Sequence, residues 1–371
     1  MERLRTGVVG CGLVAQVMHL PYLLELGDRF DVTALCDISP RALAHAGRCF
    51  PDARRHARLE DLLAEKLDAV LVLTPGSHAP AAIAAAETGR HVFVEKPMCI
   101  NPAEGRRMID AAATAGVVLM VGYMKRYDPA YEELSRTLDR SSLRYARITT
   151  LESPLDPYVA HLPLSRGGPD ADPELLESLA ADDAARVELA LPTEDALTRR
   201  VYRAFLLDSM IHELNGVRGL LGEPSALRFA RFSDDGASIT ISLSFGDVEC
   251  AVMWIDLPGI ARYEQDWSFY ASNARASLRF PSPFLRSEPT ELVVEAGEPG
   301  TAHSWRAVHS VSFDEAFKCE LVEFHAAVRE GRPPLTDGED GLRDVLLCQS
   351  IARAHAGEPA LVESRAAGAP A

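Results

Sequence analysis

Two polar residues stand four positions apart in an otherwise apolar stretch, FLLDSMIHELN. A spacing of four residues places Asp208 and His212 on one face of a helix. An imidazole titrates near neutral pH, so a histidine there can accept or donate a proton. Because the flanking side chains are apolar, the pattern predicts a buried helix, in which two polar groups need a functional reason. The alternative is a pair exposed on the surface of a helix.

A lysine ends the apolar run HVFVEKP, which is typical of a buried strand. In a parallel sheet, ligands bind at the carboxyl ends of the strands, and Lys96 stands at such an end. A lysine at the end of a strand is more often simply solvated. The position alone therefore makes Lys96 only a candidate for binding a reacting oxygen.

The stretch TGVVGCGLVAQ places Gly10, Gly12 and Ala15 in the pattern GxGxxA between a strand and a helix. The first glycine permits a tight turn, the second lets a pyrophosphate approach the backbone, and the alanine allows close packing of helix on strand. The backbone N–H groups of Leu13 and Val14, at the start of the helix, would then face the phosphates. We expect dinucleotide binding here.

An acidic residue ends the next strand, TALCD, where a carboxylate binds the adenosine ribose in dinucleotide-binding folds. Asp37 there predicts a preference for NAD over NADP, since a carboxylate repels a 2′-phosphate. Arg41 could compensate for that repulsion. The alternative is that Asp37 caps the following helix, although Ser39, which precedes Pro40, suits that position better.

The elements that must position these residues fall into two parts. Residues 1–124 alternate short apolar runs with Ala- and Leu-rich helical stretches, which predicts an α/β, doubly wound parallel sheet. Residues 125–371 are expected to form a second domain, in which alternating polar and apolar residues predict antiparallel strands and the end of the chain predicts two helices. A Pro-, Asp- and Ala-rich insertion at about 153–205 should border the substrate site or a subunit contact. We expect residues 364–371 to be disordered.

Composition excludes several classes of protein. The chain has 371 residues, 47% of them hydrophobic, and a formal net charge of −16. That charge argues against a nucleic-acid or anionic-membrane surface. The seven cysteines are scattered without CxxC pairs, so we expect neither disulfides nor a metal site. No apolar run reaches membrane-spanning length, and no signal peptide opens the chain, so we expect a cytoplasmic protein.

Several motifs together resemble the Gfo/Idh/MocA oxidoreductases, which include glucose–fructose oxidoreductase and inositol dehydrogenases. They are the glycine turn, TPGSHA, VEKPM, VGYMKRYDPAY, LLDSMIHELN, FPSPFL and EGRPPLTDGEDGLRDVLL, in that order over nearly the whole chain. The resemblance implies a Rossmann domain followed by an α/β domain with a large open sheet. It also implies a homodimer or homotetramer formed through that sheet, whose uncovered apolar face would otherwise meet water.

The resemblance also assigns roles to residues. Lys96 would bind the reacting hydroxyl, His212 would transfer its proton, and Asp208 would position substrate or tune His212. Residues expected to bind the cofactor include Thr74, Pro75, His78, Glu95 and Lys96. Residues expected at the substrate include Tyr123, Lys125 and Arg126, although the last two could instead lie at a solvated domain junction. His19 and Tyr22 are interpreted as packing residues.

The implied reaction transfers a hydride between NAD(H) and a secondary alcohol or ketone of a sugar, cyclitol or sugar derivative. Two departures weaken the inference about the substrate. RRVYRAFLLD replaces a glycine-rich segment that often precedes the family's Asp, and the insertion lengthens the chain between Lys96 and Asp208. Two alternatives stay open: a catalytically silent NAD-binding regulator, and a glycosidase or epimerase that uses NAD without net redox change.

Overall fold

The computed structural model describes residues 2–165, 168, 170–193 and 195–358, so the predicted disordered end at 364–371 lies outside the described residues. The chain divides into two compact units, each assembled from separate segments. The first unit comprises residues 1–124, 159–192 and 316–346, and the second comprises residues 125–158, 193–315 and 347–371. Residues 159–192 and 316–346, which the sequence places with the second domain, are therefore both grouped with the first unit.

The first unit is built on a six-stranded parallel sheet in the order β3-β2-β1-β4-β5-β6. This is the strand order of a dinucleotide-binding fold, and the predicted doubly wound sheet is confirmed. Buried apolar runs form its centre, as the pattern predicts. The strands are β1 (Leu4–Val9), β2 (Phe30–Cys36), β3 (Arg54–His56), β4 (Ala69–Val72), β5 (His91–Glu95) and β6 (Leu119–Gly122). The sequence did not predict β3, because Arg-Arg-His at the sheet edge carries no apolar signal.

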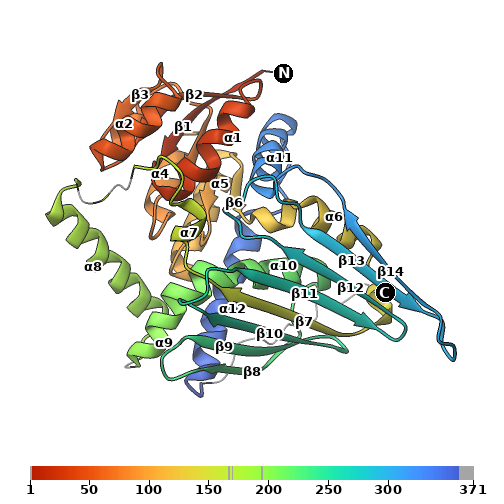
Figure 1. Ribbon diagram of the computed structural model, residues 1–371. Coiled ribbons are helices and arrows are strands. Elements are labelled where there is room, and N and C mark those ends of the chain that lie inside the picture. Colours follow the sequence, from red (N-terminus) through yellow and green to blue (C-terminus); the bar gives the residue numbers. More distant parts are fainter. Residues whose placement is uncertain (1, 166–167, 169, 194, 359–371) are drawn as a thin grey trace, which may run out of the picture. The chain divides into compact units, whose positions relative to one another are not determined.

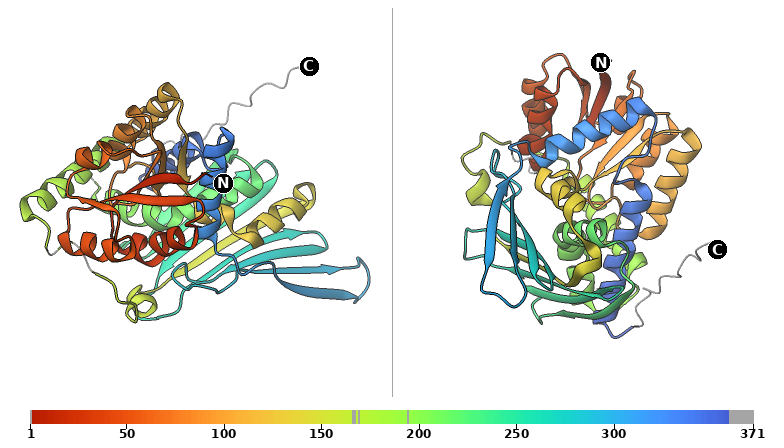
Figure 2. Two further views of the ribbon diagram at one scale, coloured as in Figure 1. Left: turned by 90° about the horizontal axis from the view of Figure 1, so that it is seen from above. Right: turned by 90° about the vertical axis from the view of Figure 1, so that its right-hand side faces the viewer.

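Helices lie on both faces of this sheet (Figure 2). The main ones are η1 (Ala15–His19) with α1 (Leu20–Glu25), α2 (Pro40–Cys49), α3 (Leu59–Leu63), α4 (Ala79–Glu87), α5 (Pro102–Ala115) and α11 (Ala316–Glu330). The helix α8 (Pro173–Ala190) is grouped with the same unit but is mostly exposed. Local sequence fixes their starts: the side chains of Ser39 and Asn101 cap α2 and α5, and each is followed by a proline in the first turn. The insertion thus holds one 18-residue helix, α8, where the sequence indicated only short helical patches.

The second unit contains an eight-stranded sheet in the order β14-β13-β12-β11-β7-β10-β9-β8 (Figure 1). Its strands are β7 (Leu143–Glu152), β8 (Ala226–Phe232), β9 (Ser238–Phe245), β10 (Val248–Asp256), β11 (Glu264–Ala271), β12 (Ala274–Phe280), β13 (Glu291–Gly297) and β14 (Ser304–Ser310). All neighbours pair antiparallel except β7 and β10, which are parallel. The mostly antiparallel sheet is confirmed, but the two central strands, β7 and β11, and the edge strand β14 were not predicted.

One face of this sheet is closed by helices of the same unit. They include α6 (Pro129–Thr137), α9 (Ala196–Val201), η4 (Tyr202–Met210) and α10 (Ile211–Leu221). The chain also contains three short elements, η2 (Met124–Tyr127), η3 (Arg140–Ser142) and α7 (Asp156–Val159), and the long helix α12 (Gly338–His355). Among the described residues no helix combines the length and the apolar character needed to cross a membrane.

The opposite face of the sheet carries charged as well as aromatic side chains. Arg147 and Asp266, on neighbouring strands, form an ion pair at 3.1 Å, and Arg279 approaches the same carboxylate at 3.4 Å. Tyr145 and Tyr270 lie beside this ladder as a tilted ring pair. Association of subunits through this face stays a prediction, and these charged residues would have to be matched by the partner.

Close packing of α10 on β11 generates a stability prediction. A Cβ added at Gly216 would lie 2.1 Å from the ring of the buried Trp267. Replacing a helical glycine by alanine normally gains up to about 1 kcal/mol. Here overpacking against a rigid ring should outweigh that gain, so Gly216→Ala should lower the free energy of unfolding by about 1–3 kcal/mol. Denaturant unfolding measures it.

Gly259→Ala is the matched control, because a Cβ there meets no atom within 4 Å. Its free energy of unfolding should stay within about 0.5 kcal/mol of the parent. Equal stabilities for the two variants would contradict the close approach of α10 to β11.

Candidate functional site

The glycine turn after β1 has the geometry that a pyrophosphate needs. Gly10 adopts φ +93°, and a Cβ there would lie 2.7 Å from the backbone nitrogen of Thr74. A Cβ at Gly12 would meet nothing within 4 Å, which leaves open space at the start of the helix. Ala15 is fully buried against the strand. The turn therefore fits a dinucleotide on grounds of backbone shape, independently of the motif.

Asp37 follows β2 and ties two turns together. One of its carboxylate oxygens accepts the backbone N–H of Cys11 at 2.6 Å, and the other accepts that of Ser39 at 2.7 Å. Each oxygen retains a second lone pair for a ribose hydroxyl. Asp37 does not cap α2; Ser39 does, because its hydroxyl accepts from the backbone of Ala42.

The turn after β5 carries Lys96 and is held in place by Glu95. One oxygen of the buried Glu95 lies 2.6 Å from Nε2 of His19, and the other accepts the backbone N–H of Lys96 at 3.2 Å. Burial alone would raise the pKa of Glu95, but the hydrogen bond with His19 and the charge of Lys96 lower it. His19 packs as predicted, against Phe93 and Phe317, and it also anchors this turn.

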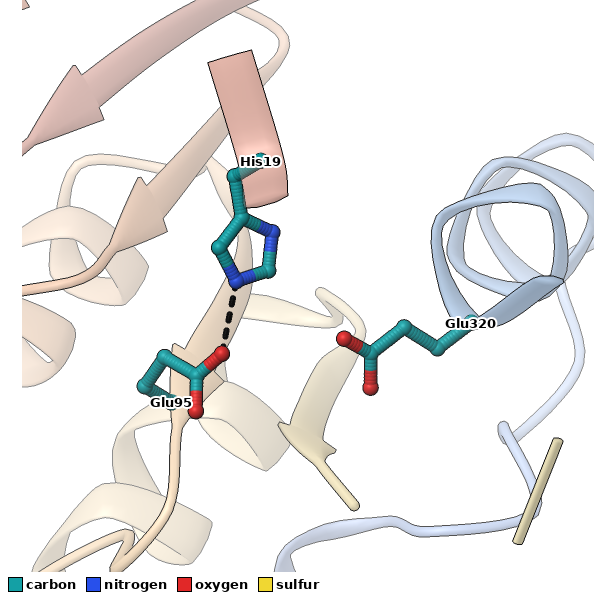
Figure 3. A group of neighbouring side chains, drawn as sticks. All are labelled: His19, Glu95 and Glu320. Carbon is teal, nitrogen blue, oxygen red and sulfur yellow. Dashed lines mark hydrogen bonds and ion pairs between the residues drawn. The ribbon is translucent and has the colours of Figure 1, made fainter. Parts of the chain in front are cut away.

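Glu320 of α11 completes this buried group (Figure 3). Its carboxyl points toward the pair, and ligand atoms of His19, Glu95 and Glu320 lie within 4.8 Å of one another. Neither oxygen of Glu320 has a hydrogen-bond partner among the described residues, and burial together with the charge of Glu95 raises its pKa well above the usual value. Glu320 is therefore a neutral acid beside an ionised Glu95. The sequence did not identify Glu320, because α11 reads as an ordinary amphipathic helix.

His78 links the loop after β4 to the turn that bears Lys96. Its two ring nitrogens lie 2.6 Å from the carbonyl oxygen of Pro97 and 2.7 Å from that of Thr74. Burial lowers the pKa of His78 although the two carbonyls act against this, so the neutral ring donates to one of them. Because it is buried, His78 positions the two turns, whereas the neighbouring Pro75 is exposed. Tyr123, at the end of β6, is buried.

The middle of the insertion, within residues 159–192, has described residues that contact η1, α5 and the start of α2 in the first unit. Gln16 and the backbone of Ser165 exchange hydrogen bonds of 2.8 and 2.9 Å. Asp170 accepts from Ser39 and from the backbone of Arg41, and Arg186 of α8 donates to Glu104 of α5 at 2.7 Å. We call residues 159–192 the strap.

Asp208 and His212 both belong to the second unit. The neighbouring apolar residues Leu206, Leu207, Met210, Ile211 and Leu214 are buried, as predicted. Asp208 itself is exposed and His212 is half-buried, so the two polar residues lie on the less buried side of the helix. Asp208 lies within the π-helical segment η4, whose wider turn displaces it from ideal α-helical spacing relative to His212.

Lys125 and Arg126 are buried inside the second unit, so the alternative of a solvated junction is wrong for both. Lys125 donates to Gln265, and its ammonium lies 5.1 Å from the ring centre of Phe280. Arg126 donates to Asn215 at 3.4 Å. Both side chains are thereby oriented by the core of the unit.

Sequence reasoning missed a carboxylate that ends β7. Ser209 donates to Glu152 at 3.1 Å and accepts from the indole of Trp254 at 3.0 Å, which places Glu152 beside the helix segment that holds Asp208. Burial raises the pKa of Glu152. The hydroxyl of Tyr263 lies 3.4 Å from the ammonium of Lys125, and burial raises its pKa well above 10. Recognising β7 as a strand would have marked Glu152 as a strand-end residue.

Comparison with known proteins agrees with this geometry. The model of the GFO_IDH_MocA family, described as an oxidoreductase family with an NAD-binding Rossmann fold, matches residues 4–123. The chain is 24% identical to myo-inositol 2-dehydrogenase of Thermotoga maritima, with 93% of this chain and 94% of the relative covered. It is 25% identical to scyllo-inositol 2-dehydrogenase (NAD(+)) of Bacillus subtilis, with 74% and 71% covered. Levoglucosan dehydrogenase in complex with NADH shares the fold with a TM-score of 0.74 at 18% identity, covering 96% of this chain and 98% of that one.

The neutral state of Glu320 predicts how stability responds to pH. As pH rises above the ordinary carboxyl pKa of about 4.3, the unfolded chain releases the proton while the folded protein keeps it, so the contribution of Glu320 to stability falls. Glu320→Gln removes this titration. Thermal unfolding should therefore show the Tm of the variant, relative to wild type, increasing from pH 4 to pH 8.

Glu323→Gln is the control on the same helix, because Glu323 is paired with Arg332 at 2.6 Å. Its relative Tm should not rise with pH, because the substitution removes a carboxylate that is paired with an arginine. A relative Tm of Glu320→Gln that stays flat or falls with pH would mean that Glu320 is ionised in the folded protein.

Proposed function

We propose that the chain uses NAD(H) to interconvert a secondary alcohol and a ketone of a cyclitol or sugar. The premise is that the chain belongs to the Gfo/Idh/MocA oxidoreductases and is an NAD(P)-dependent dehydrogenase acting on CH–OH groups. The observation that carries the choice of cofactor is Asp37, whose carboxylate is fixed beside the glycine turn by two backbone N–H groups. The choice of substrate class is supported by the inositol dehydrogenases among the relatives.

We assign the cofactor to the loops after the strands of the first unit. The turn at Gly10 and Gly12 with the N–H groups of Leu13 and Val14 would hold the pyrophosphate, and Asp37 the ribose hydroxyls. The loops at Thr74 and Glu95 would border the nicotinamide, which supplies a two-electron acceptor or donor when bound. Glu95 holds the backbone of Lys96 and acts as a positioning residue.

Lys96 and His212 are proposed to handle the reacting hydroxyl. The ammonium of Lys96 would donate to the substrate oxygen and stabilise negative charge as the C–H bond breaks. His212 would accept the hydroxyl proton during oxidation and return it during reduction, as an imidazole can near neutral pH. Asp208, near His212 in sequence and exposed, would accept from a substrate hydroxyl or orient the ring.

Remaining substrate hydroxyls would be bound by the polar group of the second unit. Glu152 is held by Ser209 and is half-buried, so its carboxylate has lone pairs available for hydroxyl donors. Lys125 supplies positive charge whose position is fixed by Gln265 and by aromatic rings. A polyhydroxylated ring needs several such partners to be bound in one orientation.

Lys96→Ala and His212→Asn should each lose activity while keeping the affinity for the cofactor. A screen of cyclitols, free sugars and nucleotide sugars with NAD, followed by NADH absorbance, identifies a substrate. On it, each variant should lose about 10²–10⁴-fold in kcat. NADH affinity, measured by fluorescence, should change little, because neither variant alters the glycine turn. Full turnover by either variant would refute its role.

Glu152→Gln tests the substrate site independently. Losing the charge of a hydroxyl acceptor should raise KM for the substrate about 10- to 100-fold with a smaller effect on kcat. Glu264→Gln, an exposed carboxylate near the same end of the sheet, should leave both constants unchanged. If the two variants behave alike, Glu152 does not bind substrate.

A further inference from the structure

The strap places a carboxylate at the start of α2, the helix that follows Asp37. Oδ1 of Asp170 accepts the hydroxyl of Ser39 at 2.7 Å, and Oδ2 accepts the backbone N–H of Arg41 at 2.8 Å. The hydrogen bond from Ser39 holds the pKa of Asp170 below its usual range, so the side chain is ionised at neutral pH. An anion supplied by the chain itself therefore takes both donors.

These donors are the ones that a phosphate would use. In dinucleotide-binding folds the ribose of adenosine lies at the end of the second strand, and a 2′-phosphate extends beyond it toward nearby basic residues. Here the hydroxyl of Ser39, the backbone N–H of Arg41 at the start of α2 and the nearby cation of Arg41 all interact with one carboxylate, and the same groups would favour a phosphate. Arg41 would otherwise offset the repulsion between Asp37 and NADP.

We propose that Asp170 is a specificity-determining residue that fills the position of a 2′-phosphate and so excludes NADP(H). The inference rests on the proposed function, because it presumes that the dinucleotide binds at the glycine turn. Asp37 and Asp170 then have different tasks: the first accepts the ribose hydroxyls, and the second withdraws Ser39 and Arg41 from any competing phosphate. Two ranges far apart in the sequence thus set one selectivity.

Other hydrogen bonds of the strap hold Asp170 in this position. Its hydrogen bonds with Gln16 of η1 on one side of Asp170 and with Glu104 of α5 on the other fix the segment to two helices of the first unit. Asp172, two residues further on, has a different partner, since its side chain accepts from the backbone of Glu174 and caps α8. The two aspartates therefore form a matched pair for an experiment.

Asp170→Ala should lower the ratio of the NADPH to the NADH dissociation constant, measured by fluorescence titration of the full chain. The ratio should fall about 10- to 100-fold, because the 2′-phosphate could then accept the two hydrogen bonds that Asp170 accepts in the wild-type protein and would no longer meet a repelling charge. NADH affinity should stay within about threefold of the wild-type value, which also verifies folding. Asp170→Asn, which removes the charge but keeps the size, should produce a smaller fall.

Asp172→Asn is the control for loss of one negative charge nearby, and it keeps a good helix cap. Its ratio should match that of the wild-type protein. If both Asp170 variants bind NADH but keep the wild-type ratio of dissociation constants, the inference is wrong while the proposed function stands. The same holds if Asp172→Asn changes the ratio as much as the Asp170 variants do. Failure of the wild-type protein to bind NADH at all would overturn the proposed function, and the inference with it.

Discussion

The carboxylate of Asp37 accepts one backbone N–H from the turn after β1 and one from the turn after β2, and the proposed cofactor site of the first unit depends on this pair of hydrogen bonds. Both turns end parallel strands, so their N–H groups have no partner in the sheet. A single side chain satisfies both and fixes the spacing between the loop that would hold phosphate and the loop that would hold ribose. Gly10, with its left-handed backbone against Thr74, sets the same spacing toward β4.

A second constraint is the burial of charge behind β5. Glu95 and Glu320 lie in one apolar interior with His19, and two ionised carboxylates could not share it. The proton resides on Glu320, since Glu95 has both the hydrogen bond of His19 and the charge of Lys96. The backbone of Lys96 is thereby anchored to the carboxylate of Glu95, whose orientation is fixed by His19.

Short sequence patterns were sufficient to predict those parts of the fold whose own residues carry the signal of a strand end or a turn. The glycine turn, Asp37 and the EKP sequence each combine a strand end with a distinctive residue, and the structure places all three at carboxyl ends of one sheet. β7 was missed because LRYARITTLE has buried positions that depend on pairing with two distant strands, and Glu152 was missed with it. The contact of Asp170 with Ser39 joins residues 131 positions apart, and no local pattern could indicate it.

The discontinuity of the first unit has a consequence for synthesis on the ribosome. Phe93 of the central sheet packs against Phe324, and the group around Glu95 is closed by Glu320, so α11 covers part of this sheet. That helix emerges about 200 residues after β6, which at roughly 5–20 residues per second is a delay of roughly 10–40 s. During this interval the nascent sheet exposes apolar side chains. Part of the sheet therefore stays uncovered in the nascent chain until α11 has been synthesised.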